Sequence, residues 1–98
     1  MAFALTAKWT AQPGAEDTVQ EAIRQLIEPS RAEPGCRLYQ ANRALDDARV
    51  FVLYEIYDDE DAYKAHGDSA HFKQYGHELA LPLLEGRERQ FFETIDPA

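Results

Sequence analysis

The longest β-favouring run of this sequence is Val50-Phe51-Val52-Leu53-Tyr54-Glu55-Ile56-Tyr57. Side chains alternate between the two faces of a strand, so the even-numbered residues share one face and the odd-numbered ones share the other. Apolar and aromatic side chains lie on both faces, which indicates that both faces are covered. We therefore expect a central strand with helices of this chain on one side and a further cover on the other.

The patterns on either side of this run predict the remaining elements. Apolar residues alternate in the strands and recur every three or four positions in the helices. The prediction is strands over residues 3–10, 36–43, 50–57 and 86–95, and helices over residues 15–32, 60–66 and 70–84. Pro29 is expected to kink or end the first helix near its last turn, and Ser69 to cap the third. The second strand is the more polar one and is placed nearer an edge of the sheet.

The element order is β-α-β-β-α-β, which predicts a ferredoxin-like α+β fold with an antiparallel sheet. Right-handed crossovers put the first and third strands in the middle of that sheet. Helices cover only one of its faces. The other face carries Phe3, Leu5 and Trp9, or the residues that alternate with them, beside aromatic residues of the later strands. Since soluble proteins avoid a large exposed apolar patch, we expect a symmetric homodimer packed sheet to sheet.

Length and charge narrow the class of protein. A chain of 98 residues predicts one domain, 1–98, with frayed ends at 1–2 and 96–98. The formal net charge of −8, with scattered basic residues, argues against nucleic acid and anionic membrane as partners. The apolar runs fall far short of the ~20 residues that span a bilayer, and no secretory signal is visible. We expect a cytoplasmic protein, whose single Cys36 forms no internal disulfide.

Several short pieces between residues 33 and 72 occur together at a recognisable spacing. They are Glu33-Pro34-Gly35-Cys36, Tyr39, Phe51–Tyr57, Ala62, Ala65-His66 and Ser69-Ala70-His71-Phe72. This combination resembles the antibiotic biosynthesis monooxygenase (ABM) family, and the flanking helix and outer strands fit that family in type and order. The resemblance implies a dimeric α+β barrel, in which two ferredoxin-like sheets face each other. It also implies a pocket in each subunit between the sheet and the helices.

The resemblance further implies a range of activities. Some relatives oxygenate phenolic polycycles or quinols without flavin, haem or metal, whereas others isomerise a small signalling molecule or break down haem. The haem-degrading branch uses an Asn, a Trp and a His at positions that hold Ala7, His66 and Gly76 here, so we expect no haem cleavage. No Gly-rich dinucleotide loop occurs in the sequence, and we expect no cofactor.

Cofactor-free oxygenation needs a base, a water-poor pocket and donors that hold the anion. His66 and His71 are the leading candidates for the base, because an unperturbed histidine titrates near neutral pH. The third histidine, His77, lies outside the family pieces, and the competing interpretation of all three is a solvated histidine near a helix end. One set of aromatic residues is expected to form the substrate pocket or, alternatively, the core and the dimer interface. These residues are Trp9, Tyr39, Tyr54, Phe72 and Tyr75.

The remaining charged features have structural explanations. Four consecutive acids, 58–61, lack the ligand spacing of a calcium loop and are expected to cap the short helix. The three histidines do not match paired i, i+4 zinc ligands, so we expect no metal. Glu55, in mid-strand, is expected to meet a cation or to line a wet cavity. The candidate cations are Arg37, Arg43, Lys8 and an arginine of a partner chain.

Three functions are therefore open. The first is a cofactor-independent monooxygenase that acts on a small quinol or polycyclic phenol with dioxygen. The second is an isomerase of a small oxygenated metabolite, which would turn over without oxygen. The third is a non-catalytic ligand-binding or stress-response dimer, whose pocket would be filled by aromatic residues such as Trp9 and Tyr39. The fold alone does not separate these functions.

Overall fold

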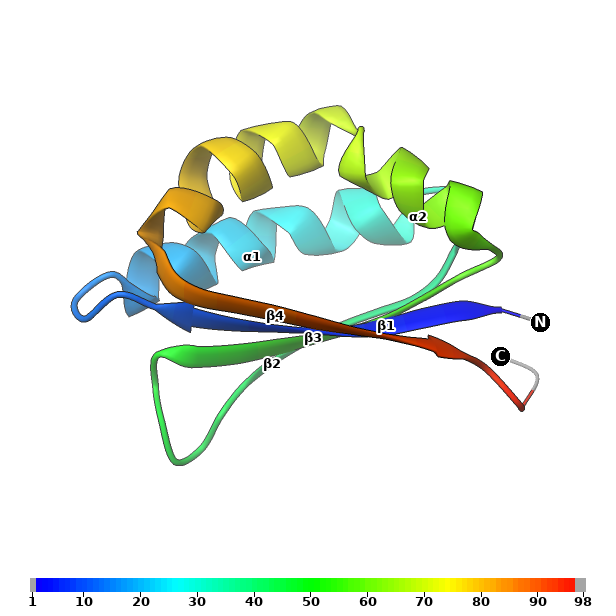
Figure 1. The fold of residues 1–98 in the computed structure, drawn as a ribbon. Coiled ribbons are helices and arrows are strands. Elements are labelled where there is room, and N and C mark those ends of the chain that lie inside the picture. The colour runs from blue at the N-terminus through cyan, green and yellow to red at the C-terminus, as the bar shows by residue number, and fades with distance from the viewer. Residues whose placement is uncertain (1, 97–98) are drawn as a thin grey trace.

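The computed structural model describes residues 2–96, which form two layers. The elements are β1 (Phe3–Ala11), α1 (Glu16–Arg31), β2 (Cys36–Arg43), β3 (Val50–Tyr57), α2 (Glu60–Gly67), the π-helix η1 (Phe72–Ala80), the 3-10 helix η2 (Leu81–Leu83) and β4 (Leu84–Glu93). The sheet has four strands, and the helices of residues 2–96 lie on one of its faces (Figure 1). None of the helices in this part of the chain is long and apolar enough to cross a membrane.

The sheet confirms the predicted topology. Its strand order is β2-β3-β1-β4 with antiparallel neighbours, so β1 and β3 are central and β2 is an edge strand. The pairing aligns Leu5 of β1 with Glu55 of β3 and Phe91 of β4. Residues that pair directly across antiparallel strands share a face, so this register determines which side chains meet the helices.

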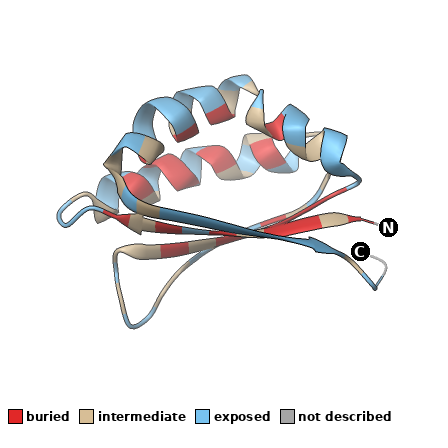
Figure 2. Ribbon diagram, in the orientation of Figure 1, coloured by how far each residue is buried: buried red, intermediate tan, exposed pale blue. Residues whose placement is uncertain are grey.

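The main core lies between the helices and the sheet (Figure 2). The predicted apolar stripe of α1 is buried here, with Val19, Ala22 and Leu26 fully enclosed. Leu5 and Trp9 of β1 are each only 1% exposed and also face the helices. Leu5 and Trp9 therefore lie on the covered side of β1, and the residues that alternate with them form the uncovered side.

The opposite side of the sheet, which we call the open face, has no helix of residues 2–96 over it (Figure 1). It is formed by residues that share a face through the strand pairing: Ala4, Thr6 and Lys8 of β1, Val52, Tyr54 and Ile56 of β3, and Phe92 of β4. Tyr54 is 39% exposed and Phe92 is 41% exposed. Ala4 and Ile56 form a small buried cluster with Ala2, packed by Leu38 of β2.

Helix α1 ends at Arg31, one residue before the predicted end at 32, with Pro29 in its last turn as expected. The Arg31 guanidinium of that turn donates to the Tyr39 carbonyl at 3.2 and 3.1 Å. The last predicted strand, in contrast, differs from the structure at both ends. Strand β4 begins at Leu84 rather than at residue 86, since Leu84 pairs with Ala11 beyond an irregularity in β1. Strand β4 ends at Glu93, before the predicted end at residue 95.

The chain ends need a second correction. Ala2 was expected to fray, but it is 3% exposed and its N–H donates to Thr94 Oγ1 at 3.1 Å. The Thr94 N–H in turn donates to the Ala2 carbonyl at 3.1 Å. Fraying predicted at residues 1, 97 and 98 lies outside the described residues.

Both predicted helix caps are present. The Asp59 carboxylate accepts from the Ala62 N–H at 2.8 Å, which explains the acidic run as the start of α2. The Ser69 hydroxyl oxygen accepts from the Phe72 N–H at 3.2 Å, where the chain turns into η1. Most of the third predicted helix is widened to π geometry, which is rare and frequently accompanies functional sites. Gly76 permits this packing, since a Cβ there would lie 2.9 Å from the Phe72 ring.

Candidate active site

A cavity of about 200 Å³ lies between the sheet and the second helical region. Its apolar wall is formed by Leu5, Ala7 and Trp9 of β1, which the strand alternation points toward the helices, together with Phe72 of η1. The charged and imidazole groups on its wall come from four elements, β3, α2, η1 and β4. They are Glu55, Lys64, His66, His77, Arg87 and Arg89. An apolar pocket with a few convergent polar groups is the usual form of a small-molecule site.

His66 lies in the last turn of α2 and is only 3% exposed. Its ring packs among three aromatic rings, with centroid distances of 5.6 Å to Tyr39, 5.6 Å to Tyr57 and 5.0 Å to Phe72. The Nδ1 atom lies 2.8 Å from Glu33 Oε2. The Nε2 atom lies 3.9 Å from Glu55 Oε1. His66 is therefore a buried, oriented imidazole, and the interpretation as a solvated helix-end residue does not apply to it.

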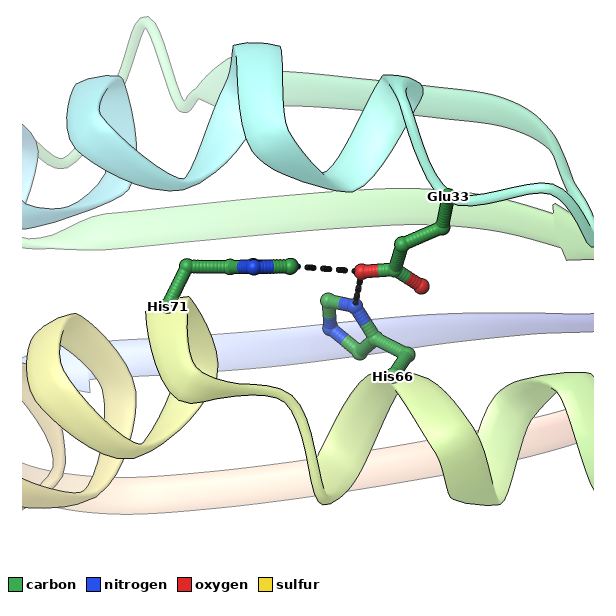
Figure 3. A group of neighbouring side chains, drawn as sticks. All are labelled: Glu33, His66 and His71. Carbon is green, nitrogen blue, oxygen red and sulfur yellow. Dashed lines mark hydrogen bonds and ion pairs between the residues drawn. The ribbon is translucent and has the colours of Figure 1, made fainter.

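Glu33 joins the two candidate histidines (Figure 3). Its Oε2 atom lies 2.8 Å from His66 Nδ1 and 2.6 Å from His71 Nε2. Glu33 follows α1 in a tight turn, where its carbonyl accepts from the Cys36 N–H at 3.1 Å. An ionised carboxylate only accepts hydrogen bonds, so each imidazole donates its N–H to Glu33. This arrangement fixes the orientation and tautomer of His66 and leaves the Nε2 lone pair available in the neutral ring.

Sequence reasoning missed Glu33 as a functional residue. The signal was present, because Glu33-Pro34-Gly35 belongs to the pieces that resemble the ABM family. We interpreted it as a turn, which it also is. The contact with His66 spans 33 positions, and it forms because the end of α1 and the end of α2 lie at the same end of the sheet (Figure 1).

Glu55 is buried, as predicted, but the expected ion pairs do not form. Its Oε1 atom accepts from the Tyr57 hydroxyl at 2.6 Å, and its side chain lines the cavity. Burial raises the pKa of this carboxyl above its usual 4.5, and the nearby Tyr57 hydroxyl and His66 offset only part of that effect. None of the three candidate cations of this chain lies at Glu55. Arg37 pairs with Asp58, Arg43 pairs with Asp17, and Lys8 lies on the open face.

The other predicted pocket residues divide by location. Trp9 and Phe72 line the cavity. Tyr39 is buried behind His66 and contacts its ring rather than the cavity, and Tyr75 packs at the edge of the main core. Tyr54 points to the open face, on the other side of the sheet, because it alternates with Glu55. His71 reaches the site through Glu33, whereas His77 lines the cavity and packs edge-on against Phe72 at 5.0 Å.

Glu33, His66 and His71 are also the residues that could hold a metal ion. Their ligand atoms all lie within 4.8 Å of one another, and two histidines with one carboxylate is a donor set used by zinc and iron. The two N···O distances of 2.8 and 2.6 Å, however, are those of direct hydrogen bonds. Ligands of one tetrahedral zinc ion lie about 3.3 Å apart. The geometry therefore fits direct hydrogen bonds from the two histidines to Glu33. A metal ion would bind here only if these hydrogen bonds were broken.

Gly35 sets how closely the Glu33 turn approaches α2. A Cβ on Gly35 would lie 2.5 Å from the Ala62 Cβ, so Gly35→Ala is expected to push the turn away and lower the free energy of unfolding by about 1–3 kcal/mol. Adding Ala62→Gly removes the clash and should recover part of the loss, despite its own helix cost of about 1 kcal/mol. Urea denaturation of the three variants checks this. Additive losses in the double variant would contradict it.

Glu55 gives a prediction about pH. The unfolded chain ionises Glu55 near pH 4.5, whereas burial raises its pKa in the folded protein. Its contribution to stability is therefore fully present below pH 4.5 and is lost as the pH rises through the higher folded-state pKa. Glu55→Gln keeps an acceptor for the Tyr57 hydroxyl but cannot ionise. We expect the variant to lose less stability than the wild type between pH 5 and pH 8 in urea denaturation. Parallel losses would exclude this cause.

The fold and the site together define a class: a small ferredoxin-like α+β domain with a cavity against its sheet and a carboxylate-held histidine on the cavity wall. The sequence model of the antibiotic biosynthesis monooxygenase family matches residues 2–78, and the chain belongs to this family.

Relatives and solved structures agree with this family. The chain is 35% identical over 73 residues to "Putative monooxygenase YcnE" of Bacillus subtilis, covering 71% of this chain and 76% of that protein. It is 32% identical over 72 residues to "Putative monooxygenase Rv0793" of Mycobacterium tuberculosis, covering 74% and 70%. The Rv0793 structure superposes with a TM-score of 0.88 over 100% of this chain and 99% of that chain, at 27% identity. PA3566 of Pseudomonas aeruginosa gives 0.87 at 30% identity, covering 97% and 95%.

Proposed function

We propose that this protein is a cofactor-independent monooxygenase that oxidises a small quinol or related phenol with dioxygen. The observation that carries the proposal is the buried His66, which Glu33 holds at Nδ1 while the ring stands on the wall of the cavity. The cavity volume of about 200 Å³ is below the ~300–1,000 Å³ of pockets for drug-sized ligands. It favours a substrate of one or two rings over a polycyclic phenol.

The chemistry follows from the position of the imidazole. A phenolic hydroxyl near Nε2 gives its proton to His66, and the Glu33 carboxylate stabilises the imidazolium that forms, as the carboxylate does in a catalytic triad. The electron-rich anion then passes one electron to dioxygen, and the two radicals combine at a ring carbon to form a hydroperoxide. Loss of water from the hydroperoxide leaves a hydroxyquinone. One oxygen atom enters the product and the other leaves as water, and the quinol supplies all four electrons.

The proposal includes a homodimer joined through the open face. Val52, Tyr54 and Phe92 leave apolar surface there that no element of residues 2–96 covers. A second copy of this chain, packed sheet to sheet, would bury it. The cavity lies on the helix side of the sheet, so each subunit would keep its own site.

Oxygen uptake tests the activity directly. Metal-free protein, dialysed against EDTA, is mixed with anaerobically prepared benzoquinols and naphthoquinols in an oxygen electrode. We expect oxygen uptake above the uncatalysed rate that is unchanged by EDTA and rises with protein concentration. Uptake that disappears with EDTA and returns with Fe²⁺ would assign the Glu33, His66 and His71 cluster to a metal instead. Turnover of a substrate without oxygen uptake would favour the isomerase.

The non-catalytic alternative required a pocket filled by aromatic side chains. Trp9 does lie on the wall, and Tyr39 lies behind His66, yet about 200 Å³ of space stays open between them and β4. That space supports a function that takes a ligand.

A further inference from the structure

The cavity wall carries positive charge that the proton transfer does not use. Arg87 and Arg89 are two residues apart on β4, so both point to the helix side of the sheet, and both line the cavity with Lys64. Glu55 is the only acid on this wall within residues 2–96. The local charge is therefore opposite in sign to the net charge of −8 that the whole chain carries.

Arg87 lacks the kind of partner that other arginines of this chain have. Arg37, Arg43 and Arg49 each lie within 2.7–3.5 Å of a carboxylate. Arg87 makes no such ion pair within residues 2–96, and its pKa is lowered, first by loss of water and then by the like charge of Arg89. Two neighbouring guanidinium groups without a carboxylate are stabilised when an anion binds between them.

Arg89 is already positioned for such a role. Its guanidinium donates to the Tyr63 hydroxyl at 2.9 Å and stands over the Phe91 ring at 5.7 Å from the centroid. Neither contact neutralises its charge. The planar fork of an arginine held in this way keeps donors free for a carboxylate.

A buried hydrogen-bond donor, the Trp9 indole, lies on the same cavity wall as the two arginines. Trp9 is 1% exposed and lines the cavity, and its Nε1 has no hydrogen-bond partner in the described part of the chain. The indole N–H can only donate, so it requires an acceptor. Trp9 lies directly opposite Arg87 in the sheet register, which brings its ring beside the arginine pair. Such an unpaired buried donor costs stability unless a ligand satisfies it.

We propose that Arg87, Arg89 and the Trp9 indole form an anion subsite, and that the substrate is an aromatic phenol or quinol that carries a carboxylate. This inference rests on the proposed function for its phenol end. Glu55, near His66 Nε2, lies opposite Leu5, and Arg87 lies opposite Trp9, four residues along β1. That separation is about 13 Å of backbone, from whose ends the side chains reach inward. A substrate of one or two rings spans the remaining gap.

Binding measured under nitrogen tests the subsite without turnover. The probes are 1-naphthoate and the neutral 1-naphthamide, titrated calorimetrically and by the fluorescence of Trp9, the single tryptophan. We expect naphthoate to bind more tightly than naphthamide. The double variant Arg87→Gln/Arg89→Gln should weaken naphthoate about 10- to 100-fold and leave naphthamide unchanged. Arg24→Gln, at an exposed arginine of α1, is the matched control and should change neither.

Two results would overturn the subsite. Equal affinities of the wild type for naphthoate and naphthamide would show that the wall does not recognise a carboxylate. Equal naphthoate affinity of the wild type and the double variant would show that the two arginines do not hold the carboxylate. Because binding is measured without oxygen, failure of the oxygenase proposal leaves the result of this test unaffected.

Discussion

Replacing His66 by glutamine is expected to lower kcat for quinol oxygenation by about 10²–10⁴-fold. The imidazole is buried, its Nε2 stands on the cavity wall, and its Nδ1 lies 2.8 Å from Glu33. Glutamine retains a polar group that can contact Glu33 but cannot accept the proton. Steady-state oxygen uptake with a one- or two-ring quinol measures the loss, with urea denaturation of the same variant to establish that it is folded.

His71→Gln is the matched control for this prediction. His71 contacts the same Glu33 oxygen at 2.6 Å but does not line the cavity. Its replacement should weaken the orientation of Glu33 and lower kcat much less than His66→Gln does. Equal losses in the two variants would contradict the assignment of His66 as the base and favour a role for both histidines as one unit, such as metal ligands.

The second large effect is expected on the open face. Tyr54→Glu places one carboxylate of each subunit in the proposed interface, opposite the uncharged Thr6 and Gln40 in the strand register, where an unpaired buried charge costs several kcal/mol. The wild type should sediment with the mass of two 11.2 kDa chains at micromolar concentration, whereas the variant should sediment as one. Gln74→Glu makes a similar change on the exposed surface of η1 and should leave the mass of the wild type unchanged.

Sedimentation equilibrium therefore tests whether the open face is the dimer interface. A wild type that sediments as a well-folded monomer would contradict the dimer. A dimeric Tyr54→Glu variant would place the interface on another surface.

The strands were predictable because their pattern is local. Alternation defined β2 and β3 to the residue, and the order of the elements defined the sheet topology. For β1, alternation gave two sets of residues but not which set faces the helices, since both sets contain apolar residues. The structure resolves this through the register, which pairs Leu5 with Glu55 and so turns both toward the cavity.

The site was only partly predictable because its contacts are distant in the sequence. His66 was identified from its type and position, whereas its partner Glu33 lies on another element. The spacing of five residues between His66 and His71 suggested no shared ligand, yet the break at 68–69 reorients the chain so that both meet one carboxylate oxygen. Phe72 and His77 of η1 line the cavity, and no sequence pattern indicated the π geometry of that helix.

The central claim is that this cavity inserts oxygen into a quinol with no bound cofactor. Metal-free protein and an anaerobic quinol are mixed with ¹⁸O₂, and the product is analysed by mass spectrometry. The proposed chemistry predicts a hydroxyquinone that carries one ¹⁸O atom, formed much more slowly by His66→Gln. An unlabelled quinone with hydrogen peroxide, or labelled product formed at the same rate by His66→Gln, would contradict it.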